Sequence, residues 1–227
     1  MPITETYLSY QIGSTKTISE HQKQALVHEF SRYPEKAETL LSGRIRPQIA
    51  EIEGFGQVII KHYFRGGILR HINRRTYLKI GKTRAAAEFD MLTRVRDIGI
   101  NAPEPVAFAS ISRGLVFYHA WLVLKEVPAA ETLAELARNT PERAEAILPH
   151  VSEQVRLLIR HHILHVDLHP GNVLVNADDQ VFLIDFDKTK TGIKNKSGLA
   201  RYYVKRWQRA VTKHGLPDFL GKMEVHD

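Results

Sequence analysis

Residues His165–Asp187, with the sequence HVDLHPGNVLVNADDQVFLIDFD, decide the fold class of this chain. Asp167 is followed five residues later by Asn172, which opens the apolar run NVLV. Polar residues at 176–180 separate this run from a second one, VFLI, which ends at Asp185. This order predicts a loop, a strand, a hairpin turn, a second strand and a loop. Such a hairpin would bring Asp167 and Asn172, at its entry, close to Asp185 at its exit.

The three polar residues are of the types that phosphoryl transfer needs. An Asp must orient the attacking hydroxyl and accept its proton, and oxygen ligands must hold the Mg²⁺ ions that bridge the phosphates. We expect Asp167 to take the catalytic role, and Asn172 and Asp185 to bind metal. For Asp187 two roles stay open, a metal contact and a structural contact.

The same segment permits a second interpretation, a transition-metal site in a hydrolase, because His-x-Asp-x-His can bind such a metal. Its candidate ligands are His161, His162, His165, Asp167 and His169. A zinc hydrolase usually needs further ligands from a remote motif, and we find none in the sequence. The asparagine and the final aspartates would also have no role. A requirement for Mg²⁺ with ATP, rather than retained Zn²⁺, would separate the two interpretations.

HVDLHPGN stands where protein kinases have H-R-D-L-x-x-x-N, and DFD stands where they have D-F-G, so the segment resembles a kinase catalytic loop. Upstream, Lys61 follows Val-Ile-Ile in a predicted strand over 57–63, which resembles the V-A-I-K strand of kinases. The resemblance implies that Lys61 holds the ATP phosphates. It also implies that Glu88, the first acid of a predicted helix over 85–96, pairs with Lys61.

Two further contacts to ATP follow from the kinase resemblance. No G-x-G-x-x-G precedes the lysine strand, and Gly43 is the glycine at the expected distance, so its backbone is expected to cover the phosphates. A long apolar strand is predicted over 114–127. The resemblance implies that its end links two lobes, with adenine bound by backbone near Lys125, Glu126 and Val127.

A basic and apolar segment, FRGGILRHINRRTYL at 64–78, is inserted between the lysine strand and the helix. It is similar to the corresponding segment of bacterial lipopolysaccharide core kinases, particularly the kinases of 3-deoxy-D-manno-octulosonic acid (Kdo). The resemblance spans about residues 43–187, and the first 40 residues match nothing. It implies that the segment meets the acceptor or the membrane. The four arginines expected to do so are Arg65, Arg70, Arg74 and Arg75.

Charge is distributed unevenly along the chain, whose net charge is +7. Residues 61–87 contain eight Lys or Arg and no acid, and residues 188–213 contain nine and again no acid. Such blocks attract polyanions, which include nucleic acid, anionic lipids and phosphorylated substrates. We expect no specific nucleic-acid partner. The chain has no cysteine, and its N-terminus lacks the features of a signal peptide.

The expected fold is a single α+β domain, bilobal and protein-kinase-like. Its N-lobe, about 1–124, would be a small antiparallel sheet with one helix. A link at about 125–128 would lead to a reduced, mainly helical C-lobe at about 129–227.

Ser19 is the expected N-cap of a short helix over 19–32, and Thr132 of a helix that begins the C-lobe. Residues 202–212 are expected to form a closing helix with Trp207 packed on the lobe. A helix over 141–162 is expected to bury one apolar stripe, made of Ile147, Val151, Val155, Leu158 and Ile159. Only 40 residues follow Asp187 and no A-P-E motif is present, so a peptide substrate is not expected.

The expected activity is phosphorylation, with ATP and Mg²⁺, of a sugar hydroxyl in the lipopolysaccharide inner core. The favoured acceptor is the Kdo residue attached to lipid A. The expected location is peripheral, on the cytoplasmic side of the bacterial inner membrane. Two alternatives stay open: a kinase for core heptose or another small molecule, and a non-enzymatic polyanion-binding protein on a kinase scaffold.

Overall fold

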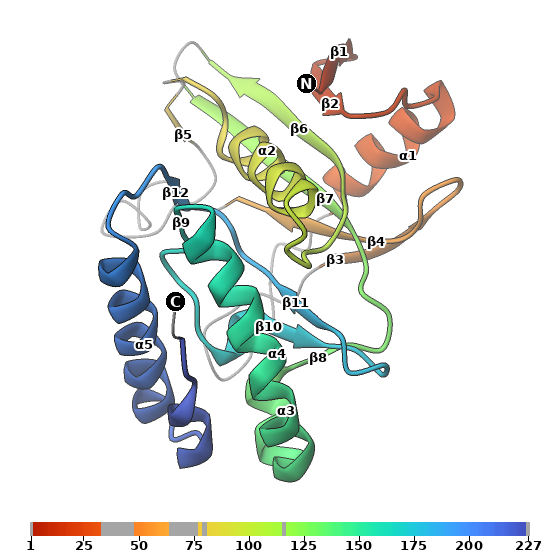
Figure 1. Ribbon diagram of the computed structural model, residues 1–227. Helices are drawn as coiled ribbons and strands as arrows, with labels where there is room; N and C mark the ends of the chain where they lie inside the picture. The colour runs from red at the N-terminus through yellow and green to blue at the C-terminus, as the bar shows by residue number, and fades with distance from the viewer. Residues whose placement is uncertain (1, 33–47, 64–76, 79–80, 115–116, 226–227) are drawn as a thin grey trace. The chain divides into compact units, whose positions relative to one another are not determined.

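The computed structural model describes residues 2–32, 48–63, 77–78, 81–114 and 117–225, which form two compact units (Figure 1). One unit comprises Met1–Asp90 and Glu104–Glu126, and the other comprises Met91–Pro103 and Val127–Asp227. The boundary after Glu126 lies within the expected link at 125–128. Residues 91–103, which the sequence analysis assigned to the N-lobe, instead group with the second unit.

The first unit is built on an antiparallel sheet in the order β1-β2-β6-β7-β4-β3, with β5 also paired to β7. Its strands are β1 (Ile3–Tyr7), β2 (Tyr10–Ser14), β3 (Gln48–Ile52), β4 (Gly56–His62), β5 (Tyr77–Leu78), β6 (Pro105–Arg113) and β7 (Phe117–Lys125). The predicted lysine strand and the strand leading to the link are β4 and β7, which pair directly. The N-terminal hairpin β1–β2, for which the sequence analysis had no prediction, extends the sheet by pairing with β6.

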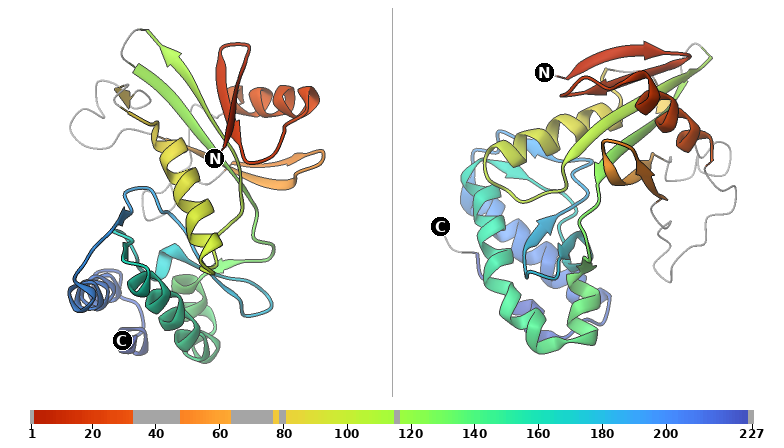
Figure 2. Two further views of the ribbon diagram at one scale, coloured as in Figure 1. Left: turned by 45° about the horizontal axis from the view of Figure 1, so that its top comes forward. Right: turned by 90° about the vertical axis from the view of Figure 1, so that its right-hand side faces the viewer.

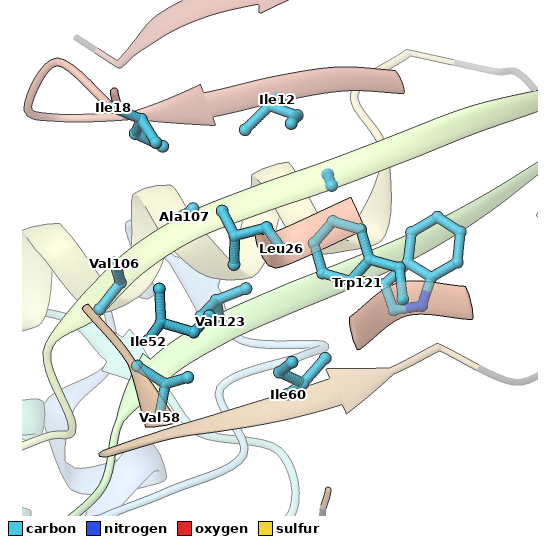
Figure 3. Packing of buried hydrophobic residues seen from close by; sticks show 12 residues of the cluster. Ile12, Ile18, Leu26, Ile52, Val58, Ile60, Val106, Ala107, Trp121 and Val123 are labelled. Atoms are coloured by element: carbon cyan, nitrogen blue, oxygen red, sulfur yellow. The ribbon is translucent and has the colours of Figure 1, made fainter. Parts of the chain in front are cut away.

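Helix α1 (Glu20–Ser31) packs on one face of this sheet and closes a hydrophobic core (Figure 3). Its predicted N-cap is confirmed, because the Ser19 side chain accepts from Gln22 N–H and the Gln22 side chain accepts from Ser19 N–H. Val58 and Ile60 of β4 point into this core. Since side chains alternate along a strand, Lys61 projects from the opposite face.

Helix α2 (Arg84–Asp97) confirms the helix predicted over 85–96, and its Phe89 packs on the sheet. The Phe89 and Phe108 rings lie 5.1 Å apart, and Phe108 pairs with Gly13 of β2. A Cβ atom at Gly13 would lie 2.1 Å from the Phe108 ring. The ring therefore occupies its position only because residue 13 is glycine, which makes the N-terminal hairpin part of the packing around α2.

The second unit is mainly helical, with short strands. Its elements are β8 (Glu131–Thr132), α3 (Leu133–Asn139), α4 (Pro141–Arg160), β9 (Ile163–Leu164), η2 (Pro170–Asn172), β10 (Val173–Val175), β11 (Val181–Leu183), β12 (Lys190–Thr191), α5 (Lys196–Lys213) and η3 (Asp218–Lys222). Helices α3, α4 and α5 can be followed by their colours in Figure 2. The predicted N-cap Thr132 is confirmed by a reciprocal pair of hydrogen bonds with Glu135.

The apolar stripe predicted on the helix over 141–162 is confirmed as core of the second unit. Its members are buried: Ile147, Val151, Val155, Leu158 and Ile159. The predicted closing helix is also confirmed as α5, where Trp207 is buried and its indole N–H donates to the Leu220 carbonyl at 2.8 Å. Among the described residues, no helix combines the length and the apolar character needed to cross a membrane.

The predicted hairpin is confirmed: β10 and β11 pair antiparallel, with Val173 opposite Leu183. Its turn is closed by Asn176, whose side-chain oxygen accepts from the N–H groups of Asp178 and Gln180. Arg143 of α4 holds the turn from outside, with Nε 2.8 Å from an Asp179 carboxylate oxygen. This hairpin fixes the two ends of the expected catalytic segment.

Candidate active site

The hairpin brings Asn172 next to the residue that precedes Asp185. The N–H of Ile184 donates to the Asn172 carbonyl at 3.0 Å, and Leu183 is in turn anchored to the Asn101 carbonyl at 2.9 Å. The Asn172 side-chain nitrogen donates to the Asp167 carbonyl at 2.8 Å. The predicted proximity of these three polar residues is therefore present in the second unit. It arises from the backbone hydrogen bond of Ile184, which precedes Asp185, and from the side chain of Asn172.

Asp185 sits at a backbone position that few residues adopt. Its φ is +66°, in the left-handed region, where residues other than glycine are uncommon and cost free energy. The following residue, Phe186, is buried, and its ring lies 4.8 Å from the His165 ring. Burial of Phe186 thus turns the chain so that Asp185 is exposed at the end of β11.

The histidines of the segment are engaged with backbone. His165 is buried and its Nε2–H donates to the Ile184 carbonyl at 2.9 Å, while His169 Nδ1 accepts from Gly171 N–H at 3.1 Å. His162 Nδ1 lies 2.8 Å from the Ile193 carbonyl. Across the part of the chain that the structure describes, no group of three or more His, Cys, Asp or Glu could hold a metal ion. The rings of His162, His165 and His169 are therefore bonded to nearby backbone and, with the other described residues, do not form the metal cluster that the hydrolase interpretation needs.

The oxygen atoms of Asn172 and Asp185 fit Mg²⁺. Since the Asn172 side-chain nitrogen donates to Asp167, its amide oxygen is the atom left for a ligand. Mg²⁺ prefers oxygen ligands, retains several waters, and is usually bound by one or two carboxylates together with substrate phosphates. Asn172 is buried and Asp185 is exposed, so these two protein oxygens leave room for the waters and phosphate oxygens of a metal that arrives with a nucleotide.

Helix α5 holds the catalytic loop by three side chains. The Tyr203 hydroxyl donates to the Ile163 carbonyl and accepts from His165 N–H, both at 2.8 Å. The Tyr202 hydroxyl donates to the Val166 carbonyl at 2.8 Å. Burial raises the pKa of Tyr203 above the ordinary value of 10.0, so its hydroxyl stays protonated as a donor.

The third side chain from α5 is Arg206, whose guanidinium Nη2 donates to a carboxylate oxygen of Asp167. Both side chains remain accessible to solvent, with 28% of Arg206 and 51% of Asp167 exposed. Asp167 is therefore oriented from two sides, through its carbonyl by Asn172 and through its carboxylate by Arg206.

In the first unit, Lys61 and Glu88 form the expected ion pair. Lys61 Nζ lies 2.9 and 2.8 Å from the two carboxylate oxygens of Glu88, which is only 2% exposed. Tyr63 also donates a hydrogen bond to this carboxylate, and its ring lies 5.4 Å from Lys61 Nζ. The Lys61 side chain is 30% exposed, so it stays accessible to a ligand while Glu88 and Tyr63 fix its position.

Two of the three backbone N–H groups in the segment expected to bind adenine are already hydrogen-bonded within the first unit. The N–H of Lys125 donates to the Glu104 carbonyl at 2.8 Å, and that of Glu126 donates to the Gln57 carbonyl at 3.1 Å. Val127 N–H makes no backbone hydrogen bond with the residues that the structure describes. Of the three expected positions, Val127 is therefore the one with an N–H to offer a base. Gly43, Arg65, Arg70, Arg74 and Arg75 lie outside the described residues.

Sequence reasoning did not find four residues that contact the expected site: Tyr63, Tyr202, Tyr203 and Arg206. The first lies two positions after the lysine and so returns to the same face of the extended chain. The other three lie in the acid-free block at 188–213, which we interpreted only as a polyanion-binding surface. The available signal was that Arg206 follows Tyr202 by four residues, which places both side chains on one face of the predicted helix.

The family model described as "Lipopolysaccharide kinase (Kdo/WaaP) family" matches residues 41–217. The chain belongs to this family. A Vibrio cholerae protein named 3-deoxy-D-manno-octulosonic acid kinase is 30% identical over 164 residues, which cover 70% of this chain and 69% of that protein. A Photobacterium profundum protein of the same name is 33% identical over 184 residues, covering 70% and 75%. These matches confirm the resemblance stated from the sequence, and membership makes the chain a kinase.

A solved structure, WaaP in complex with acyl carrier protein, matches with a TM-score of 0.50 and 18% identity over 84% of this chain and 77% of that one. At this identity the likeness concerns the fold alone. It confirms the expected α+β, protein-kinase-like fold class.

Proposed function

We propose that this kinase transfers the γ-phosphoryl group of ATP to a sugar hydroxyl of the lipopolysaccharide inner core, with the Kdo residue on lipid A as acceptor. The observation that carries the proposal is the Asp167–Asn172–Asp185 arrangement in a chain of the lipopolysaccharide kinase family. The names of the relatives support Kdo over heptose as the acceptor.

Asp167 would orient the acceptor hydroxyl and accept its proton as the acceptor oxygen bonds to the γ-phosphorus. The bond from that phosphorus to the oxygen of the leaving ADP breaks in the same displacement. Asp167 suits this role because Asn172 and Arg206 fix its direction while its carboxylate stays accessible. Most of the rate enhancement would come from positioning and charge stabilisation.

Lys61 would bind the ATP phosphates, supported by Glu88 and Tyr63. Asn172 and Asp185 would hold Mg²⁺, which when bound neutralises charge on the phosphate oxygens. The Val127 N–H would donate to adenine.

The direct test is incubation of the purified protein with ATP, Mg²⁺ and Kdo–lipid A, followed by mass spectrometry of the lipid. The expected product carries one added phosphate on Kdo. Competing a heptose-extended core against Kdo–lipid A in the same tube separates the two acceptors. No phosphate on either lipid, together with tight binding to both, would favour a polyanion-binding protein and refute the proposal.

A second part of the proposal concerns location: peripheral attachment to the cytoplasmic face of the inner membrane. It is motivated by the two acid-free blocks, since each Lys or Arg near anionic lipid contributes about 1 kcal/mol and salt screens the attraction. Replacing Arg70, Arg74 and Arg75 with alanine should weaken sedimentation with anionic vesicles and raise KM for the lipid acceptor. Loss of ATP affinity with unchanged vesicle binding would instead assign these arginines to the nucleotide.

A further inference from the structure

The contact between Arg206 and Asp167 places a cation beside the group that the proposed function assigns to the acceptor hydroxyl. Arg206 is fixed on a helix that is itself tied to the loop, because Tyr202, one turn earlier on the same side of α5, hydrogen-bonds the Val166 carbonyl. Tyr203 adds two buried hydrogen bonds to the same loop. The guanidinium is therefore held in position before any substrate arrives.

Only part of the hydrogen-bonding capacity of this pair is used. A guanidinium has five N–H donors, and the described residues provide one partner for Arg206, the Asp167 Oδ1 atom. The contact leaves Asp167 Oδ2 for a hydroxyl. Arg206 can thus bridge Asp167 and a second anion without releasing the first.

The surroundings of Arg206 favour an anion as the second partner. Helix α5, KSGLARYYVKRWQRAVTK, contains no Asp or Glu, and Arg209 and Lys213 follow Arg206 at helical spacing. A planar guanidinium fork matches a carboxylate in two parallel hydrogen bonds. An octulosonic acid, the acceptor in the names of the relatives, carries such a carboxylate on the same sugar as its hydroxyl groups.

We propose that Arg206 binds the carboxylate of the acid sugar whose hydroxyl Asp167 orients, and so selects the acceptor. This inference rests on the proposed function. A sugar held by its carboxylate at Arg206 presents its hydroxyl groups to Asp167 in one orientation, because the two protein groups are in contact. The selectivity would concern both the choice of an acid sugar and the choice of hydroxyl.

The test compares Kdo–lipid A with a carboxyl-reduced analogue, in which the acid is a primary alcohol, using wild type, Arg206→Ala and Arg206→Lys. The wild type should show a KM about 10- to 100-fold higher for the reduced acceptor, the usual effect of losing a charge-assisted pair. Arg206→Ala should show that higher KM for both acceptors, and Arg206→Lys an intermediate preference. KM for ATP should not change.

Arg209→Ala is the matched control, since it removes the same charge one turn further along α5 and should keep the wild-type preference for the acid. A third acceptor, Kdo on dephosphorylated lipid A, separates the sugar carboxylate from the lipid phosphates. The proposal expects Arg206→Ala to lose discrimination against the reduced sugar and to keep any response to the phosphates. Thermal melts of all variants show whether each is folded.

Three results would overturn the inference. In the first, Arg206→Ala still prefers Kdo–lipid A over the carboxyl-reduced analogue. In the second, kcat of Arg206→Ala falls equally for both acceptors and the ratio of their KM values stays that of the wild type. In the third, Arg206→Ala loses only its response to the lipid phosphates. The second result would make Arg206 a positioning residue for Asp167. A wild-type protein that phosphorylates no Kdo acceptor would refute the proposed function itself, which is a distinguishable outcome.

Discussion

The two units position their candidate functional residues in different ways. In the first unit, Lys61 on a strand and Glu88 on a helix lie 27 positions apart, and the buried Glu88 carboxylate pairs with the partly exposed lysine side chain. In the second unit, Asp167, Asn172 and Asp185 lie within 19 consecutive residues and are positioned by one loop and one hairpin, through backbone hydrogen bonds and the Asn172 side chain.

This difference predicts how substitutions act on each group. The Lys61–Glu88 pair is called the lysine half, and Asp167, Asn172 and Asp185 are called the aspartate half. The lysine half depends on one ion pair between side chains of two elements. A single substitution therefore leaves the other charged group without its partner. The aspartate half depends on the backbone hydrogen bonds of the hairpin, on the Asn172 side chain, and on the brace, the side chains of α5 that hydrogen-bond to the loop. Substitutions there should affect the reaction more than the stability, except where they touch the brace.

Apart from the substitution of Asp167 itself, the largest effect is expected from Asp185→Asn, in the aspartate half. Removing the charge that holds Mg²⁺ should cost several kcal/mol of transition-state stabilisation, on the order of a 10³-fold loss of kcat. Because the left-handed position tolerates asparagine, the thermal midpoint should change little. Steady-state rates across a Mg²⁺ titration check this. Full recovery of kcat at a modest Mg²⁺ concentration would mean that Asp185 is not essential for binding the metal.

The lysine half should respond to a double-mutant cycle in stability. Lys61→Met leaves the buried Glu88 carboxylate without its cation and should cost about 1–3 kcal/mol of unfolding free energy. Adding Glu88→Leu to Lys61→Met should recover part of this loss, since no charge then remains buried. Denaturant unfolding of the two singles and the double measures the coupling. Additive losses would mean that the pair is not coupled.

Tyr203→Phe tests the brace on the catalytic loop, with Tyr202→Phe as its control. Removing the buried Tyr203 hydroxyl leaves the His165 N–H and the Ile163 carbonyl unsatisfied, which should cost about 1–3 kcal/mol. The Tyr202 hydroxyl is at the surface, so water can replace it, and the loss should stay below about 1 kcal/mol. Equal losses in chemical denaturation would contradict the proposed brace.

The same tyrosine predicts a smaller effect at alkaline pH. Since burial raises the pKa of Tyr203 above 10.0, the unfolded chain loses this proton before the folded one. The stabilising contribution is complete below pH 10 and is lost as pH rises beyond it, at up to about 1.4 kcal/mol per pH unit. Unfolding free energies between pH 9 and 11 should fall less steeply for Tyr203→Phe. Identical slopes would refute the assignment.

Much of the second unit was predictable because its signals are local. The hairpin, the Thr132 N-cap, the stripe on α4 and the closing helix were all read from spacing and residue type, and the structure confirms each. The brace from Tyr202, Tyr203 and Arg206 was not predictable in this way. It joins positions 36 to 40 residues apart, and no local pattern specifies which loop a helix will meet.

The first unit shows the same limit. The Lys61–Glu88 pair was reached through the kinase resemblance and not through spacing. The N-terminal hairpin escaped prediction because its alternation is weak and its partner, β6, lies about 95 residues away. Gly13 could not be recognised from sequence as a packing position, since only the observed Phe108 ring explains the need for glycine there.

The central claim is that Asp167 directs phosphoryl transfer from ATP to a sugar of the lipopolysaccharide core. The most direct measurement is the initial rate of phosphate transfer to Kdo–lipid A, followed by mass spectrometry, for wild type and Asp167→Ala side by side. The account predicts one added phosphate with the wild type, and a kcat about 10²–10⁴-fold lower for Asp167→Ala with ATP affinity retained. An Asp167→Ala protein that turns over at nearly the wild-type rate would contradict it.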